Sequence, residues 1–171
     1  LKDFIKRSKL QDAYVFLGLH GGFGEGGGIQ ELLEKEGVPF NGSKSEAAKL
    51  CMDKFETGKV VDSLKLPSLR TAKKTFVTID ELKKIANSND YENYWNELTK
   101  EFGADKVIIK PRKDGCSTGV VVLTSAEEFK KYVEFFTLGI DIAPEGTFKM
   151  HSGPITLGVH NREILIEEYI E

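Results

Sequence analysis

The sequence predicts a mixed α/β and α+β protein in two parts, and two patterns support this. Over residues 13–42 an apolar run, a helical pattern and a second short apolar run follow one another, as in a βαβ unit with parallel strands. Later, apolar runs at 106–110 and 120–123 flank a short polar loop, as in an antiparallel hairpin. We therefore expect a parallel first sheet and a largely antiparallel second one, divided within Leu64–Ala72.

The individual elements follow from apolar period, capping residues and turn signals. In the first part we expect a helix end at 3–10, a strand at 13–19, a helix at 29–36, a strand at 38–40, and a helix that begins at a Ser43–Glu46 capping box and reaches about residue 59. In the second part we expect a strand at 74–78, helices at 79–86 and 91–102, the hairpin, a helix at 125–136 and a strand at 163–170. Residues 137–162 have no clear period, so we expect an irregular surface excursion there.

Composition excludes several classes of protein. The 171 residues carry a net charge of −3 with 30% charged residues, unlike a polybasic nucleic-acid binder or an acidic disordered tail. The two cysteines and three histidines lack zinc-ligand spacing, and no apolar run is long enough to span a membrane. We expect a cytoplasmic protein (or one of an organelle stroma) with no nucleic-acid or membrane partner. Because the chain opens on Leu1 and stops abruptly in a strand-like segment, we also expect it to be an excised fragment.

Six glycines occupy the eight positions from Gly21 to Gly28, between the first strand and its helix. Glycine accepts positive φ and lets a ligand approach the backbone, and successive N–H groups beside a helix N-terminus can bind an anion. The spacing Gly22-x-Gly24-x-x-Gly27 matches the dinucleotide fingerprint, but no acidic residue follows the second strand, and Glu25 inside the loop would repel a pyrophosphate. A glycine-rich turn without a ligand stays open as the alternative.

A second candidate site lies around Lys110, at the end of the buried strand Val107–Lys110. A charge in that position needs an anion, or the lysine reaches solvent at the strand edge. The loop that follows contains Gly115, Cys116, Ser117 and Gly119, whose small polar residues suit a hairpin that covers phosphate oxygens.

Together these segments resemble the D-alanine–D-alanine ligase family of ATP-grasp enzymes. The motifs that carry the resemblance keep the family order: His20-Gly21-x-x-Gly24-Glu25-x-Gly27, Gly37-Val-Pro-Phe-Asn-Gly-Ser43, Met52-Asp53-Lys54 with Lys59 after it, Ile109-Lys110-Pro111 with Gly115-x-Ser117-x-Gly119, and Leu165-Ile166-Glu167-Glu168-Tyr169-Ile170. The resemblance implies residues 1–65 as the end of an N-terminal α/β domain and 66–171 as the central ATP-grasp lobe up to the adenine hinge strand.

The resemblance also implies roles for individual residues. It gives a substrate-binding role to His20, Gly21 and Glu25, and catalytic roles to His20 and Cys116. It gives ATP binding to Lys59, Lys110, Gly115, Cys116, Ser117, Glu167, Glu168 and Ile170. From the residues alone, His20 could equally make a structural hydrogen bond, and Glu167 could be a solvated strand carboxylate.

The expected parent reaction is ATP-dependent ligation of a carboxylate to an amine through an acyl phosphate, with ATP and small amino acids as ligands and a homodimer as one expected assembly. Mg²⁺ is the second expected cofactor, and its ligands are expected outside these residues, with none within them. Gly26 and Cys116 depart from the family pattern, where aspartate and serine are usual. Two alternatives therefore stay open: a ligase for another amino acid or peptide, and a non-catalytic nucleotide-binding relative.

Overall fold

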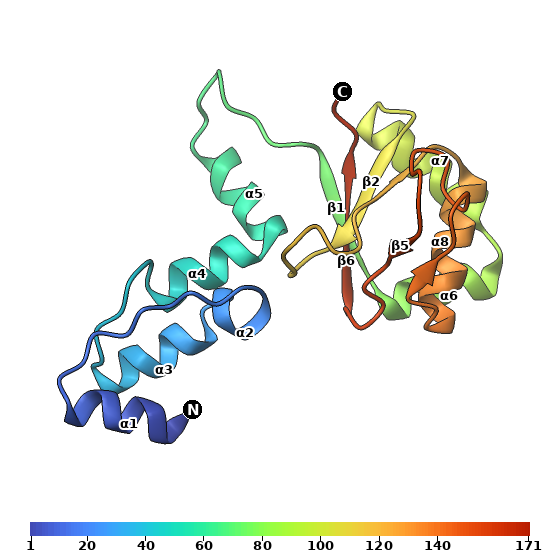
Figure 1. Cartoon of the computed structure of the whole chain (residues 1–171). Helices are drawn as coiled ribbons and strands as arrows, with labels where there is room; N and C mark the ends of the chain where they lie inside the picture. The colour runs from blue at the N-terminus through green and yellow to red at the C-terminus, as the bar shows by residue number, and fades with distance from the viewer. The chain divides into compact units, whose positions relative to one another are not determined.

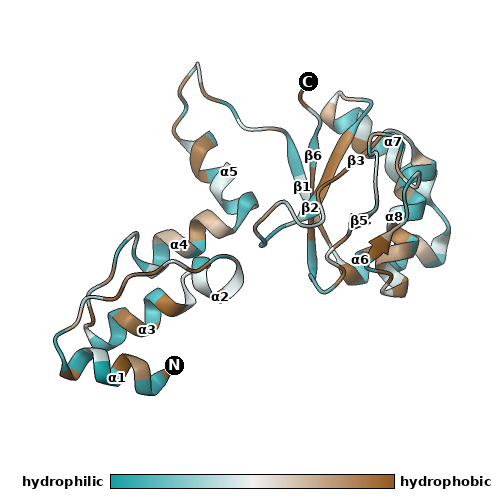
Figure 2. Cartoon of the chain, in the orientation of Figure 1, coloured by the Kyte–Doolittle hydropathy of each residue, from teal (hydrophilic) through white to brown (hydrophobic).

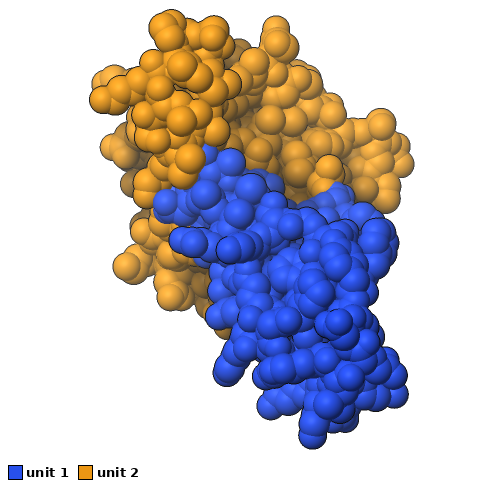
Figure 3. Space-filling model, turned by 90° about the vertical axis from the view of Figure 1, so that its left-hand side faces the viewer, with its two compact units in different colours: residues 1–57, 113–116 blue, residues 58–112, 117–171 orange.

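A computed structural model describes all residues from 1 to 171. By their contacts the residues form two compact units, which are coloured separately in Figure 3: residues 1–57 with 113–116, and residues 58–112 with 117–171. We describe each unit by itself. The predicted domains, 1–65 and 66–171, come from the family resemblance and not from contacts. These two units therefore do not test them, and they stay a prediction.

The second unit is built on a four-stranded sheet in the order β1-β6-β2-β3. Its strands are β1 (Lys74–Thr78), β2 (Val107–Pro111), β3 (Val121–Leu123) and β6 (Glu163–Glu168). Every pairing is antiparallel, which confirms the expected sheet. The last strand of the sequence lies between β1 and β2, so residues far apart in the chain become neighbours across it (Figure 1).

Three helices cover one face of this sheet (Figure 1): α6 (Ile79–Ser88), α7 (Tyr91–Phe102) and α8 (Ala126–Leu138). The predicted capping box of α6 is present, because Thr78 Oγ1 accepts from Glu81 N while Glu81 Oε2 accepts from Thr78 N. Alternate strand residues point toward the helices, and Figure 2 shows hydrophobic residues along the strands. The buried residues of β2 and β6 on this face are Val107, Ile109, Ile164 and Ile166.

The expectation for residues 137–162 is wrong. They contain a short antiparallel pair, β4 (Ile142–Ala143) with β5 (Ile155–Thr156), and they contribute Ala143, Phe148 and Leu157 to the core of the second unit. Phe148 is 1% exposed and Leu157 is fully buried. The segment has no sequence period because its apolar residues enter the core singly, from turns, rather than along one face of a regular element.

The first unit contains four helices and the beginning of a fifth, and no extended sheet. The helices are α1 (Lys2–Leu10), α2 (Gly22–Glu25), α3 (Gly28–Glu36), α4 (Ser45–Met52) and α5 (Lys54–Ser63), whose later residues belong to the second unit. The expected strands at 13–19 and 38–40 reduce to one parallel bridge between Val15 and Phe40. Each segment has little beyond the other to pair with, and Phe16 stays 79% exposed.

The expected capping box at Ser43–Glu46 is also wrong. Helix α4 begins at Ser45, and its N-cap residue Lys44 makes no side-chain cap. Ser45 instead donates from both its backbone N–H and its hydroxyl to Glu34 on α3. The single predicted helix is interrupted at Asp53, whose Oδ1 accepts from two backbone N–H groups at the start of α5. None of the helices combines the length and apolar character that crossing a bilayer requires.

Candidate functional site

The face of the four-stranded sheet opposite the helices carries a row of charged side chains. Because side chains alternate along a strand, the residues that flank the core positions Ile164 and Ile166 on β6 point the other way. Glu167 is one of them. Lys74 is its direct partner on β1, and Lys110 lies two residues along β2 from its other partner, Ile108. Three charged side chains from three strands therefore share one face.

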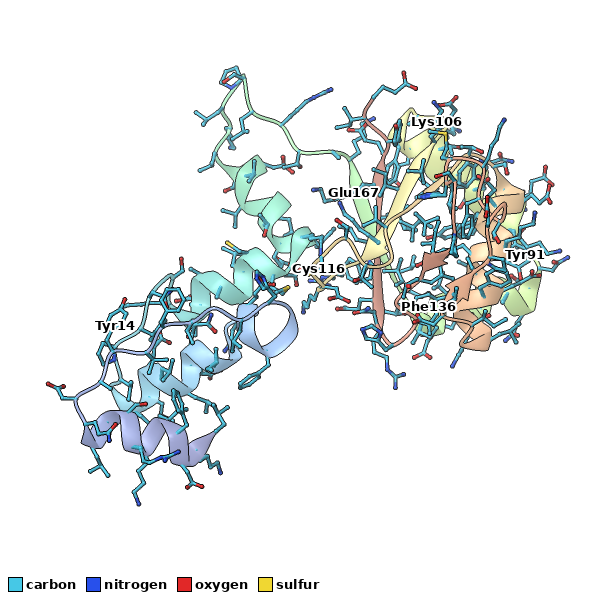
Figure 4. All side chains as sticks on the ribbon, in the orientation of Figure 1. Tyr14, Tyr91, Lys106, Cys116, Phe136 and Glu167 are labelled. Atoms are coloured by element: carbon cyan, nitrogen blue, oxygen red, sulfur yellow. The ribbon has the colours of Figure 1, made fainter.

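These three side chains form one ion-pair cluster. Lys74 Nζ lies 3.2 Å from Glu167 Oε1, and Lys110 Nζ contacts the other oxygen, Glu167 Oε2. The side chains of Lys74, Lys110 and Glu167 are only 13%, 21% and 10% exposed. Figure 4 labels Glu167 beside the strands and Phe136 among the helices. One carboxylate thus balances two ammonium groups, which leaves a positive charge at a largely buried position.

A second ion pair lies further along the same face. Arg112 Nη1 is 3.1 Å from Glu163 Oε1, and the guanidinium lies 4.4 Å from the centre of the Phe76 ring. The guanidinium and this carboxylate carry opposite charges, and the aromatic ring adds a favourable contact for the guanidinium.

Helix α5 supplies the next two residues of interest in the second unit. The predicted phosphate-binding Lys59 is exposed. Its neighbour Gly58 is buried, and a methyl group at Gly58 would lie 2.7 Å from Lys74 Nζ. The absence of a side chain at Gly58 therefore gives the end of Lys74 its space.

The predicted adenine-binding end of β6 is partly engaged within the sheet. The backbone N–H of Glu168 donates to Lys73 O at 3.0 Å, and Glu168 Oε1 accepts from Lys73 N. Tyr169 N donates to Lys106 O, while Ile170 is 56% exposed. The structure thus buries Glu167, which is not the solvated strand carboxylate that the sequence left open, and leaves Ile170 exposed.

In the first unit, the glycine loop folds around its own carboxylate. Glu25 ends the short helix α2, and its Oε2 accepts from Gly21 N at 2.6 Å, while His20 Nδ1 lies 3.5 Å from Glu25 Oε1. Gly21, Gly22 and Gly27 all have positive φ, as the glycine density predicts. The three predicted substrate residues His20, Gly21 and Glu25 therefore lie together.

A cavity of about 500 Å³ adjoins this loop within the first unit. Its lining combines apolar side chains with a few polar groups: Leu17, Leu19, Gln30, Asn41, Ser43 and Met52 among others. Asn41 exchanges hydrogen bonds with the backbone of Leu17, and Gln30 Nε2 donates to Gly24 O. These bonds fix the walls of the cavity.

The loop that follows β2 carries backbone strain. Cys116 and Ser117 both have φ of 55°, a conformation that side-chain-bearing residues rarely adopt. Cys116 is exposed, and Gly115 is grouped with the first unit, where a methyl group on it would lie 3.2 Å from Glu25 Oε2. Consecutive non-glycine residues with positive φ indicate a loop whose shape is maintained by its surroundings.

The 171 residues bring together no group of three His, Cys, Asp or Glu side chains that could hold a metal ion.

Comparison with known proteins gives a consistent result. No protein-family model matches the chain. The D-alanine–D-alanine ligase of Aquifex aeolicus is 31% identical over 121 residues, which cover 69% of this chain and 35% of that protein. The enzyme of the same name from Clostridium perfringens is 33% identical over 133 residues, covering 77% of this chain and 38% of the relative. The chain belongs to the D-alanine–D-alanine ligase-like family.

A solved structure supports the same fold. The D-alanine–D-alanine ligase of Bacillus anthracis, determined in complex with ATP, superimposes with a TM-score of 0.62 at 23% identity and covers 99% of this chain. This chain covers 44% of that structure, and it spans little more than a third of the length of the curated relatives it matches. The ligase-like fold of the chain is thus confirmed, as an ATP-grasp fold with an antiparallel sheet.

Sequence reasoning missed Lys74. It reads as one of two consecutive lysines at the start of an ordinary strand, Lys73 and Lys74, and nothing local distinguishes them. Their roles differ because successive side chains of an extended chain point to opposite sides. Lys73 Nζ donates to the carbonyl of Phe102 at the end of α7, and Lys74 pairs with Glu167. Only the register between β1 and β6, which are separated by more than eighty residues, could reveal this.

Proposed function

We propose that this chain is the nucleotide-binding and substrate-binding part of an ATP-dependent carboxylate–amine ligase of the D-alanine–D-alanine ligase type. The observation that carries the proposal is the Lys110–Glu167 cluster on the sheet face opposite the helices, in a chain whose relatives bear that name. A partly buried excess of positive charge suits the phosphates of ATP. The cytoplasmic location and the homodimer are parts of the same proposal.

In the proposed reaction, the carboxylate of the first amino acid attacks the γ-phosphorus of ATP, which forms an acyl phosphate and releases ADP. The amine of the second amino acid then attacks the acyl carbon, and inorganic phosphate leaves as the amide bond forms. Lys110, Lys59 and the loop residues Gly115, Cys116 and Ser117 contribute positive charge and N–H donors to the transferring phosphoryl group. Glu167, Glu168 and Ile170 bind the adenine end.

His20, Gly21 and Glu25 are proposed to hold the substrate. The imidazole of His20 lies beside the loop, with its Nδ1 3.5 Å from Glu25 Oε1, where it can donate a hydrogen bond to a substrate carboxylate. Mg²⁺ is the expected second cofactor. No group of three His, Cys, Asp or Glu side chains in this chain could hold a metal ion, so no step assigned to this chain passes through Mg²⁺.

The test is equilibrium binding of ATP to the 171-residue chain by calorimetry, with Lys110→Ala, Lys110→Arg and an exposed-helix control, Lys83→Ala. We expect Lys110→Ala to weaken ATP binding about tenfold or more, since a hydrogen bond to a charged group contributes on the order of 1.5–3 kcal/mol. Lys110→Arg should retain part of the affinity, and Lys83→Ala all of it. Absence of ATP binding by the unmodified chain, or an unchanged affinity in Lys110→Ala, would reject the proposal.

A second experiment addresses the reaction in the longer protein of which we propose this sequence to be a part. Release of ADP that depends on D-alanine is the expected result. Release with a different amino acid or a peptide alone would favour the other ligase considered above, and no release with any amine would favour the non-catalytic relative. Cys116→Ser should leave turnover unchanged or raise it, because a hydroxyl is a stronger hydrogen-bonding group than a thiol.

A further inference from the structure

We infer that Lys74 is a further phosphate-binding residue, which shares the charge of the nucleotide phosphates with Lys110 from the opposite side of Glu167. The inference deepens the proposed function and rests on it. Its observation is the two-to-one cluster in which Lys74 Nζ and Lys110 Nζ contact the two different oxygens of one carboxylate.

The charge balance of the cluster is the first argument. A structural ion pair on a strand face is complete with one lysine and one glutamate, and Lys110 with Glu167 already forms that pair. Lys74 adds a second ammonium group that is 13% exposed, at a position where an uncompensated charge is unfavourable. A bound anion would balance it. The phosphate of a nucleotide is the anion that the proposed function brings to this face.

The space around Lys74 is the second, independent argument. The helix α5 carries glycine at position 58, in its interior, where glycine is less favourable than alanine. The Lys74 side chain occupies the space that a side chain at Gly58 would need, with its Cδ, Cε and Nζ atoms 2.7–3.2 Å from the added methyl group. The glycine thus weakens its own helix and admits the end of Lys74, which is the arrangement expected if the position of that ammonium group matters.

Lys73 shows the contrast on the neighbouring position. Its ammonium group donates to the carbonyls of Glu101 and Phe102 and so caps the end of α7. Lys73 thus binds a helix terminus and stabilises the fold. Lys74 differs because its partner, the Glu167 carboxylate, is already paired with Lys110.

The experiment measures binding of ATP and of adenosine to the 171-residue chain by calorimetry, for Lys74→Met, Lys74→Arg and the control Lys83→Met on the exposed face of α6. We expect Lys74→Met to weaken ATP binding about tenfold or more and to leave adenosine binding unchanged, because adenosine has no phosphate. Lys74→Arg should restore most of the ATP affinity. Lys83→Met removes the same charge elsewhere and should bind ATP normally.

Thermal unfolding without nucleotide distinguishes a binding role from a structural one. If Lys74 only stabilises the sheet, Lys74→Met lowers Tm and weakens ATP and adenosine alike, which would overturn the inference. We expect Tm to stay the same or rise, since Lys110 still balances Glu167 and the excess charge is gone.

Gly58→Ala offers a second route to the same answer without changing any charge. The added methyl group should displace Lys74 Nζ and weaken ATP binding, while Gly153→Ala, where a methyl group meets open space, should not. Normal ATP binding by Gly58→Ala and Lys74→Met together, in a chain that binds ATP, would reject Lys74 and leave the proposed function intact. Failure of the unmodified chain to bind ATP would reject the proposed function itself.

Discussion

The two units of this chain divide their apolar residues unequally. In the second unit nineteen buried residues form one continuous cluster beneath the sheet, whereas the cluster of the first unit contains five. Both units leave some large apolar side chains in solvent, such as Phe16 at 79% exposure in the first and Leu138 at 73% in the second, so the two units differ in the size of the core. The difference teaches that a sequence pattern typical of a buried strand produces one only where neighbouring elements cover both of its faces.

The largest effect is expected in the core of the second unit. Phe129 on α8 is fully buried, and its ring stacks on Tyr94 with 5.2 Å between centroids. Phe129→Ala should reduce the free energy of unfolding by about 3–5 kcal/mol, through lost transfer energy and a cavity. Trp95, the only tryptophan, belongs to the same cluster, so its fluorescence during urea unfolding follows this unit. Leu138→Ala, at a 73% exposed position on the same helix, is the control and should change little.

A comparable change in the first unit should act on that unit alone. Leu33 on α3 is fully buried among Ile5, Val15, Ile29 and Val38. Leu33→Ala should cost about 2–5 kcal/mol, which a five-residue core cannot absorb, so hydrogen exchange along α3 should lose its protection. The Trp95 transition should not move. A matching shift of both signals would mean that the units unfold as one, which would break the comparison. Leu32→Ala, at a half-buried neighbour, is the control.

In both units the sequence predicted best the features that depend on residues close together in the chain. The capping box at Thr78–Glu81 and the hairpin strands depend on nearby residues, and both are confirmed. The strand expected at 13–19 depends on partners that its own residues do not specify, and it reduces to one bridge at Val15. Residues 137–162 depend on long-range packing of Phe148 and Leu157, which no local period records.

The same distinction between local and long-range features applies to the residues of the candidate site. Lys110 could be identified from sequence because a lysine at the end of an apolar strand is unusual in itself. Lys74 could not, because its importance arises from its register with Glu167 across β6. The roles assigned to His20 and Glu25 stay predictions. Their contact at 3.5 Å is seen only in the structure, since neither composition nor spacing predicts it.

A smaller effect is expected at the start of α6. Thr78→Ala removes the oxygen that accepts from Glu81 N and should reduce the stability of the second unit by about 1 kcal/mol. Thr78→Ser keeps the oxygen and should retain most of that stability. The hydrogen bond from Thr78 N also lowers the pKa of Glu81, so this contribution is present above the ordinary pKa of glutamate and is lost as the pH falls. Equal stability of the two variants in urea unfolding would contradict this assignment.

The smallest effect concerns His151, which lies in the irregular segment and caps the edge strand β3. Val122 N donates to His151 Nε2 at 3.0 Å, so this nitrogen must be unprotonated. Burial lowers the pKa of His151, and the nearby Glu128 carboxylate opposes that shift only in part. Since the folded state disfavours the proton, the stability from this contact is fully present above the ordinary histidine pKa of 6.5 and is lost as the pH falls through the lowered value.

The expected loss between pH 7.5 and pH 5 is no more than about 1 kcal/mol, the net value of one hydrogen bond. His151→Gln keeps an acceptor that does not titrate, so the Trp95 unfolding transition of this variant should vary less with pH than that of the unmodified chain. His160→Gln, at an exposed histidine of the same unit, should keep the full pH dependence. If His160→Gln and His151→Gln flatten the pH profile equally, the bond to Val122 is not the source. If only His151→Gln flattens the pH profile, the pH dependence arises from the bond between His151 and Val122. One polar contact then joins residues 137–162 to the edge strand β3, and mild acid removes it, so part of the stability of the second unit depends on a single bond.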